Sequence, residues 1–228
     1  MKGDIYHILN RGVEKRKIFL DEKDYLRFVH NLYDFNNKNE IFISYHRRQS
    51  AMRKPTGGER SMKRDNLVDI LCWCLMPNHY HILVREKING GASAFSKKIS
   101  SGHTQYFNLK NERSGVLFQG RSKIIPVKQD NYFLYLPFYI FANPIKLIEK
   151  DWQEKSIKNL KQVINFLENY QWSSYLNVIG KDNFSFVVNQ NKFSKSFIGD
   201  KKQFKKDFIE WLVGYAKADK NIYAKREV

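Results

Sequence analysis

The sequence predicts an α/β or α+β fold with a mainly antiparallel sheet. Strand-like and helix-like segments alternate along the chain, and two of the strand-like segments lie close enough together to form a hairpin. The 228 residues are 42% hydrophobic and 15% aromatic, so the chain has enough apolar material for a substantial core, which argues against extensive disorder. This length is typical of one domain, or of one domain with an extension.

Runs of β-branched and aromatic residues mark the predicted strands. They span residues 5–10, 41–46, 67–75 and 79–85, and residues 115–127 are also expected to be extended. The turn Met76-Pro77-Asn78 joins the third of these strands to the fourth.

Apolar residues at helical spacing mark the predicted helices. The first helix covers residues 21–36, where Phe28 and Leu32 share a face and Asp21 or Asp24 can accept the free backbone N–H groups of the first turn. The other expected helices span residues 93–110, 154–169 and 204–218, and an apolar, aromatic segment of residues 130–142 stops at Asn143-Pro144.

The charge balance favours a polyanionic partner. Lys and Arg number 40 against 23 Asp and Glu, which gives a net charge of +17. Nucleic acid is the leading candidate, because Lys and Arg release counterions when they neutralise phosphates. Residues 47–66 form a polar loop rich in Lys and Arg, which is expected either to contact DNA or to be a solvated hairpin loop.

The cysteine content favours a reducing compartment. Cys72 and Cys74 are too close in sequence to staple a fold, so we expect them to be reduced and the protein to be cytoplasmic. The sequence has neither an apolar run long enough for a membrane span nor a recognisable signal peptide, so no membrane association is expected.

Two histidines form the first candidate site. Successive side chains of a strand point to opposite faces, so His79 and His81 share one face and could chelate one divalent ion, while Tyr80 points into a core. An alternative is that they are two histidines at an exposed strand end. Cys72 and Cys74 face one way as well, so a Cys₂His₂ zinc site with these histidines is a further alternative.

Tyr139 and Asn143 form the second candidate site. If residues 130–142 are helical, the two side chains lie four positions apart on one face, where a phenol and an amide oxygen could sit over a bound metal ion. A phenol has an ordinary pKa of about 10, so it needs activation to serve as a nucleophile. The alternative is a buried aromatic residue followed by a residue that merely ends the helix.

Several motifs occur together in an order that resembles a known family. Residues 76–83 (MPNHYHIL) resemble the HUH motif, with Tyr80 between the histidines. The order is similar to that of the single-tyrosine HUH endonucleases and transposases, particularly the REP-associated tyrosine transposases, named for repetitive extragenic palindromes. The other matching motifs are residues 6–12 (YHILNRG), Ile18-Phe19, Asp24-Tyr25, residues 106–108, Ser114-Gly115, residues 118–121 (FQGR), Tyr139-Ile140 with Asn143-Pro144, and residues 170–175.

The resemblance implies a fold and an activity. The fold would be α+β, with a ferredoxin-like antiparallel sheet and flanking helices in residues 1–180, followed by a basic helical extension in residues 181–228. The activity would be metal-dependent cleavage and rejoining of single-stranded DNA beside a hairpin. By this resemblance, His79, His81 and Asn143 would bind Mg²⁺ or Mn²⁺, and Tyr139 would form a 5′-phosphotyrosine link and release a 3′-OH.

The sequence departs from the family near the tyrosine. Phe138 stands where many relatives have Arg, and Pro137 removes one helical N–H, so either could re-aim Tyr139. Tyr135, one turn earlier, is a rival nucleophile.

Further polar residues flank the proposed centre and are candidate DNA contacts. Lys and Arg would hold phosphates and Gln could read base edges. These candidates are Arg11, Lys97, Lys98, His103, Gln105, Gln119, Arg121 and Lys123. A non-catalytic module for structured DNA or RNA is the alternative function, and either a monomer or a homodimer is compatible with the sequence.

Overall fold

The computed structural model describes residues 2–38, 64–127, 131–189, 193 and 200–215. Its described residues form a four-stranded sheet in the order β2-β3-β1-β4, with every neighbouring pair antiparallel. The strands are β1 (Ile5–Arg11), β2 (Val68–Met76), β3 (His79–Glu86) and β4 (Lys123–Val127). With α1 (Glu22–Asp34) after β1 and α3 (Gly91–Lys110) after β3, the order β-α-β-β-α-β is the ferredoxin-like arrangement, so the expected α+β class is confirmed.

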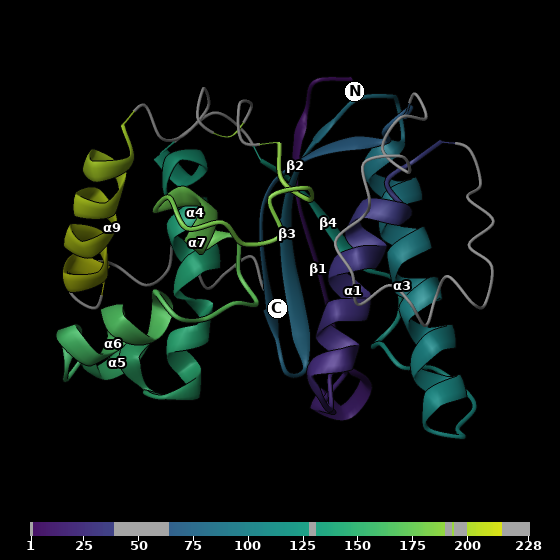
Figure 1. Cartoon of the computed structure of the whole chain (residues 1–228), viewed down its shortest axis with the longest axis horizontal. Helices are drawn as coiled ribbons and strands as arrows, with labels where there is room; N and C mark the ends of the chain where they lie inside the picture. The colour runs from purple at the N-terminus through teal and green to yellow at the C-terminus, as the bar shows by residue number, and fades with distance from the viewer. Residues whose placement is uncertain (1, 39–63, 128–130, 190–192, 194–199, 216–228) are drawn as a thin grey trace.

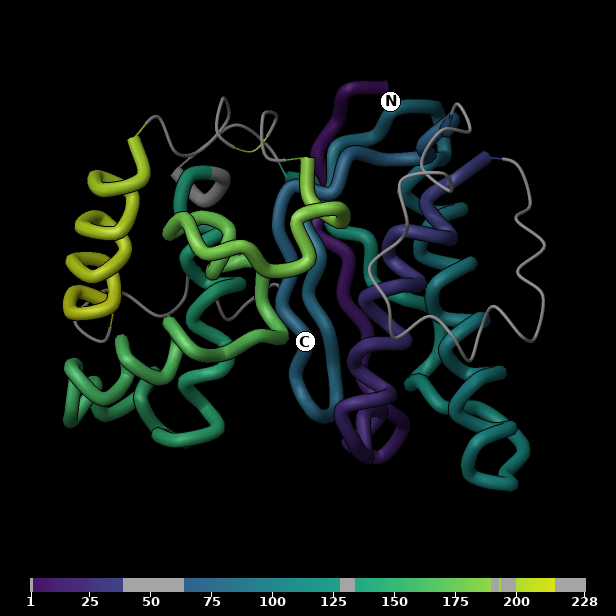
Figure 2. The backbone as a smooth tube through the Cα atoms, in the orientation of Figure 1, coloured from purple at the N-terminus to yellow at the C-terminus, as the bar shows by residue number. Residues whose placement is uncertain are grey.

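The sheet lies between two helical layers (Figures 1 and 2). Helices α1 and α3 cover one face, and the helices of the C-terminal half cover the other. The second layer contains α4 (Asn131–Ala142), α5 (Trp152–Lys155), α6 (Leu160–Leu167), α7 (Tyr175–Val178) and α9 (Lys201–Tyr215). No helix in the described ranges is long and apolar enough to span a membrane.

Side chains alternate between the two faces of each strand, so the core is divided into two clusters, one on each face of the sheet. Tyr80 and Ile82 of β3 face α1 and α3, where the Tyr80 ring lies 4.9 Å from the Phe28 ring. Leu83 of β3 faces the opposite cluster, together with Phe141 of α4. As expected, Tyr80 is fully buried, and the residues on either side of it turn toward α4.

The free edge of β2 is covered by a later part of the chain. The Leu75 N–H donates to the Trp172 carbonyl, and the Asn189 N–H donates to the Ile70 carbonyl, each at 2.9 Å. Val187 and Val188 join the cluster under α1 and α3, and Phe204 and Phe208 of α9 join the cluster under α4. Part of the predicted extension 181–228 therefore contributes to both cores of the molecule.

The predicted helix 154–169 is wrong as a single element. The chain forms α5 and α6 instead, with Ser156 between them at a positive φ of 70°. The Asn159 side chain then caps α6 by accepting the Gln162 N–H at 3.0 Å, so the helix restarts with its own cap. Apolar spacing does not reveal this break, because Ile157 keeps the periodicity. The predicted strand 41–46 and most of the loop 47–66 lie outside the described residues.

Candidate active site

The two histidines of β3 share the sheet face that is covered by α4. In the antiparallel register His79 lies opposite Arg11 and His81 lies opposite Leu9. The two imidazole rings are 5.1 Å apart between centroids, with their planes at 85°. His81 is buried, whereas His79 is half-buried at the end of the strand.

The turn before β3 determines the tautomer of His79. Asn78 donates its Nδ2–H to the Lys15 carbonyl at 3.1 Å, so its Oδ1 is the atom 2.6 Å from His79 Nδ1. An amide oxygen can only accept, so Nδ1 of His79 carries the proton. The Nε2 of His79 therefore carries a lone pair.

His81 is held in the same way, but by another histidine. Its Nδ1 lies 2.9 Å from Nε2 of His7 in β1, and His7 is buried with 1% of its surface exposed. His7 is the diagonal neighbour of His81 across the β1–β3 pair, since His81 is opposite Leu9.

Tyr139 and Asn143 lie over these histidines. The Tyr139 ring meets the His81 ring edge to face, with centroids 5.9 Å apart and planes at 89°. Asn143 follows α4 and donates Nδ2–H to the Tyr139 carbonyl at 2.9 Å. Its side chain also makes a hydrogen-bond contact with His79. Both Tyr139 and Asn143 are buried.

The site is electropositive although its imidazoles are neutral. Burial is the main cause that lowers the pKa of His79 to about 3, and the charges of Arg11 and Lys146 act in the same direction. Burial also holds the pKa of His81 well below its usual range, again with contributions from Lys146 and Arg11. Two neutral nitrogen donors beside two cations suit an anionic ligand such as a phosphate.

The donor set suits a divalent ion of borderline softness. A neutral imidazole has one N–H, which His79 gives to Asn78, so its other nitrogen presents a lone pair toward the Asn143 amide. Imidazole nitrogens and an amide oxygen are donors that a divalent transition-metal ion accepts, so the side chains of His79, His81 and Asn143 fit a metal ion by type. Within the described ranges, no three or more His, Cys, Asp or Glu residues gather to hold a metal ion. The Cys₂His₂ alternative is therefore not formed, and burial raises the pKa of both thiols.

The residues that depart from the family pattern have defined positions. Helix α4 runs through Pro137 without interruption. Phe138 is buried against α9, with its ring 4.9 Å from Phe204 and 5.5 Å from Phe208. Tyr135 is 38% exposed and its recorded ring contact is with Phe138, so Tyr139 is the tyrosine that lies against the histidines.

Four of the candidate DNA contacts gather at the site's end of the sheet. The Gln119 N–H donates to the Arg11 carbonyl at 2.9 Å, and Lys123 is opposite Leu9 in the β1–β4 pair. Arg121 lies between Gln119 and Lys123, and all four side chains are exposed.

The other candidates lie on α3, in the opposite layer. Lys97 and Gln105 are exposed there, and Lys98 donates to the Asn37 carbonyl at 2.7 Å. His103 is fully buried, with Nε2 2.8 Å from the Ile18 carbonyl. The prediction that His103 contacts DNA is therefore wrong for this conformation, because its ring belongs to the core between α3 and the sheet.

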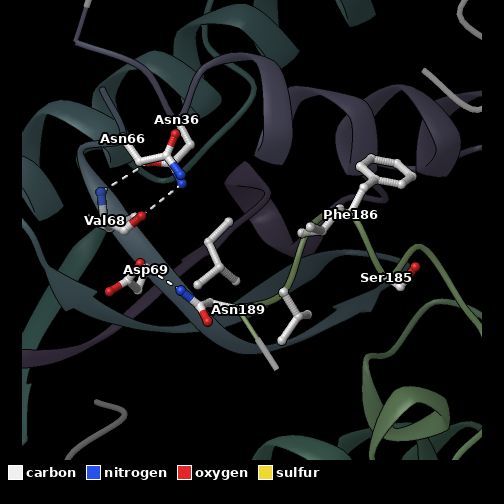
Figure 3. A pocket seen from close by; sticks show the side chains of 10 residues that line it. Asn36, Asn66, Val68, Asp69, Ser185, Phe186 and Asn189 are labelled. Atoms are coloured by element: carbon white, nitrogen blue, oxygen red, sulfur yellow. Dashed lines mark hydrogen bonds between the residues drawn. The ribbon is translucent and has the colours of Figure 1, made fainter. Parts of the chain in front are cut away.

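A separate cavity of about 530 Å³ lies at the other end of β2 (Figure 3). Its polar side chains bond mainly to protein groups: both side-chain polar atoms of Asn36 pair with the Val68 backbone, and Asn189 donates to Asp69 at 3.0 Å. These groups stabilise the β2 edge and leave few hydrogen-bonding atoms for a ligand.

Two residues near the centre were not among the sequence-based candidates. Lys146 lies three positions after Asn143 in a 3-10 turn (Asn143–Leu147) and close to His79. A basic residue so soon after the candidate ligand Asn143 was a signal in the sequence that could have identified it. His7 offered a weaker signal, since the sequence does not say which face of β1 meets which face of β3.

The fold and site thus define an antiparallel α+β protein with a histidine pair, an amide and a tyrosine at one end of its sheet. No protein-family model and no curated protein sequence matches the chain. Among solved structures, it is similar to a REP-associated tyrosine transposase bound to a REP hairpin. The identity is 15% and the TM-score 0.47, over 78% of this chain and 81% of that one.

Proposed function

We propose that this protein is a metal-dependent endonuclease and strand transferase that acts on single-stranded DNA with Tyr139 as its nucleophile. The observation that carries the proposal is the contact of the Tyr139 ring with His81, at 5.9 Å between centroids. A phenol beside two neutral imidazoles, an amide oxygen and two cations has the components that phosphoryl transfer requires.

The proposed reaction is a transesterification. The Tyr139 oxygen gives up its proton and forms a bond to the scissile phosphorus, the bond from phosphorus to the 3′ oxygen breaks, and that oxygen takes up a proton and leaves as a 3′-OH. The product is a 5′-phosphotyrosine link, and attack by a 3′-OH on this link rejoins strands without ATP. A Mg²⁺ or Mn²⁺ ion bound by His79, His81 and Asn143 would supply charge neutralisation at the phosphate.

Charge at the site supports a nucleic-acid substrate. Arg11 and Lys146 lie close enough to lower the pKa of both imidazoles, and cations so placed also attract a phosphate. Gln119, Arg121 and Lys123 extend this polar, basic surface along β1 and β4. By the sequence resemblance, the substrate is single-stranded DNA next to a REP-like hairpin.

The test is covalent capture on a denaturing gel. The full chain is mixed with single-stranded DNA from the flanks of its own gene, with Mn²⁺, Mg²⁺ or EDTA, and compared with Tyr139→Phe, Tyr135→Phe and His81→Ala. We expect an adduct that needs metal, persists in Tyr135→Phe and is lost in the other two. We also expect Mn²⁺ to support more adduct than Mg²⁺, because imidazole ligands suit transition metals better than Mg²⁺. An adduct that survives Tyr139→Phe removes Tyr139 as the nucleophile.

Burial of the centre favours one alternative, a non-catalytic module that binds structured nucleic acid. Tyr139 is 6% exposed and Asn143 2% exposed, so a phosphate reaches them only if α4 or its surroundings move. Tight DNA binding without an adduct on any flank, at any metal concentration, would establish this alternative.

A further inference from the structure

We propose that His7 is a positioning residue that holds the His81 ring and fixes which of its nitrogens is free to bind a metal ion. The metal-binding part of this inference rests on the proposed function, whereas the state of the His81 ring does not.

The geometry of the His7–His81 pair is that of a hydrogen bond in the plane of both rings. The facing nitrogens are 2.9 Å apart, the ring centroids are 5.1 Å apart and the planes differ by only 21°. That centroid separation is close to the largest that nitrogens at this distance permit, so both nitrogens lie near the line joining the centroids. The rings meet edge to edge, and the N–H of one points along the lone pair of the other.

This contact decides which atom of His81 remains available. Its Nδ1 faces His7, so Nε2 is the nitrogen that points elsewhere. If His81 donates from Nδ1 and His7 accepts at Nε2, the Nε2 of His81 is left with a lone pair. His79 has the same arrangement, since its Nδ1–H is given to Asn78. Each candidate ligand is then oriented through Nδ1 and presents Nε2, which is the pattern of metal-binding histidines held by a hydrogen-bonding neighbour.

Packing alone does not account for an imidazole at position 7. His7 is 1% exposed, and its Nδ1 is buried with no hydrogen-bond partner in the described part of the chain. A buried polar atom without a partner is unfavourable, and a leucine would fill the position without that atom. The bond to His81 is the interaction that an apolar side chain cannot make.

The choice of a neutral neighbour has a consequence for charge. Metal-binding histidines are often oriented by a carboxylate, which adds negative charge to the site. Here His7 and Asn78 are both uncharged, so neither adds negative charge beside Arg11 and Lys146.

The first test reads the His81 ring directly in metal-free protein. Two-bond ¹H–¹⁵N spectra distinguish an Nδ1–H imidazole from an Nε2–H imidazole, and the His81 signals are assigned by their loss in His81→Gln. We expect the Nδ1–H form in the wild-type protein and in His7→Gln, whose amide oxygen can accept in place of Nε2. We expect a mixture of forms in His7→Leu. An Nε2–H form in the wild-type protein would overturn the inference, whatever the variants do.

The second test measures binding of Mn²⁺ alone by calorimetry, without DNA. We expect His7→Leu to weaken the affinity about 10- to 100-fold, the usual cost of losing such a neighbour, and His7→Gln to stay closer to wild type than His7→Leu does. His30→Leu is the matched control, because it removes a buried imidazole of α1 on the other side of the sheet. Unchanged affinity in a folded His7→Leu overturns the positioning role. If the wild-type protein binds no Mn²⁺, the proposed function fails, and the spectra still decide the state of His81.

Discussion

Replacement of Phe138 by alanine is expected to loosen the C-terminal helix from the helix that carries Tyr139. Phe138 is 5% exposed, and its ring lies 4.9 Å from Phe204, 5.5 Å from Phe208 and 5.9 Å from Trp211. These three aromatic residues all belong to α9, so Phe138 connects α9 to α4, together with Phe141, whose ring lies 6.2 Å from Phe204. The neighbouring residue Tyr139 faces the histidines instead. Phe138 therefore helps to fix the rotation of α4 from the face next to the one that carries Tyr139.

The expected loss of stability follows from this burial. Removing a buried phenylalanine side chain costs about 3–5 kcal/mol of unfolding free energy. For a chain of this size that corresponds to a decrease in Tm of roughly 6–20 °C. Thermal unfolding followed by circular dichroism measures it, with Leu134→Ala as control. Leu134 is on the same helix but 53% exposed, so its replacement should change the unfolding free energy by no more than about 0.5 kcal/mol.

Covalent capture on the same variants separates stability from alignment. Below its Tm, Phe138→Ala should still give less adduct than Leu134→Ala, because a freer α4 holds Tyr139 less firmly against His81. A Tm for Phe138→Ala within about 2 °C of wild type would refute the reasoning, since the loss of a contact worth several kcal/mol must lower the Tm by more than that. The same packing disfavours a charged residue at position 138, because a guanidinium here would be buried among the aromatic rings of α9.

Two further predictions concern charge. Burial lowers the pKa of His103 to about 4, below the 6.5 of an unfolded chain, so the unfolded state binds more protons in this range and stability falls as the pH drops from 6.5 to 4. In His103→Leu, the difference in unfolding free energy between pH 7 and pH 4 should be smaller than in the wild type by on the order of 3 kcal/mol. Urea unfolding at the two pH values measures this difference. Equal pH dependence in both proteins would contradict the burial argument. Lys146→Ala should weaken binding of single-stranded DNA and lower the salt-dependence slope of log K by about 0.7, the share of one phosphate contact. Lys155→Ala, which removes an exposed lysine paired with Asp151, is the control for that titration, and an equal effect of both variants would leave Lys146 as general surface charge.

The local elements were predictable because their signals are local. The apolar, β-branched run predicted as strand 67–75 is observed as Val68–Met76, and the helix predicted at 93–110 begins two residues earlier, at Gly91. The break between α5 and α6 was missed because it depends on one residue, Ser156, whose positive φ of 70° has no periodic signature. The position of α9 on α4 was also missed, because it depends on contacts between residues far apart in the sequence, such as Phe138 and Phe204.

Only those parts of the candidate site that lie within one strand or one helix could be predicted from the sequence. The two-residue spacing of His79 and His81 places both on one face whatever the strand pairs with, and the four-residue spacing of Tyr139 and Asn143 places them together on one helix. His103 was misplaced although the spacing along α3 carried the signal. Phe95, Ile99 and His103 follow one another at intervals of four and share one face of the helix, and all three are buried.

His7 shows why the rest of the site could not be found in the sequence. A shift of one residue in the β1–β3 register would turn every β1 side chain to the other face and would move His7 into the layer of α1 and α3. The register is set on that other face, where Ile8 lies opposite Ile82 and both are fully buried. A slip would take Ile8 away from Ile82 and bury polar β1 side chains such as His7 in its place, at a cost of several kcal/mol. The contact between His7 and His81 is therefore maintained by residues that never touch the site, and substitutions at Ile8 or Ile82 should disturb the histidine pair before they disturb the helices around it.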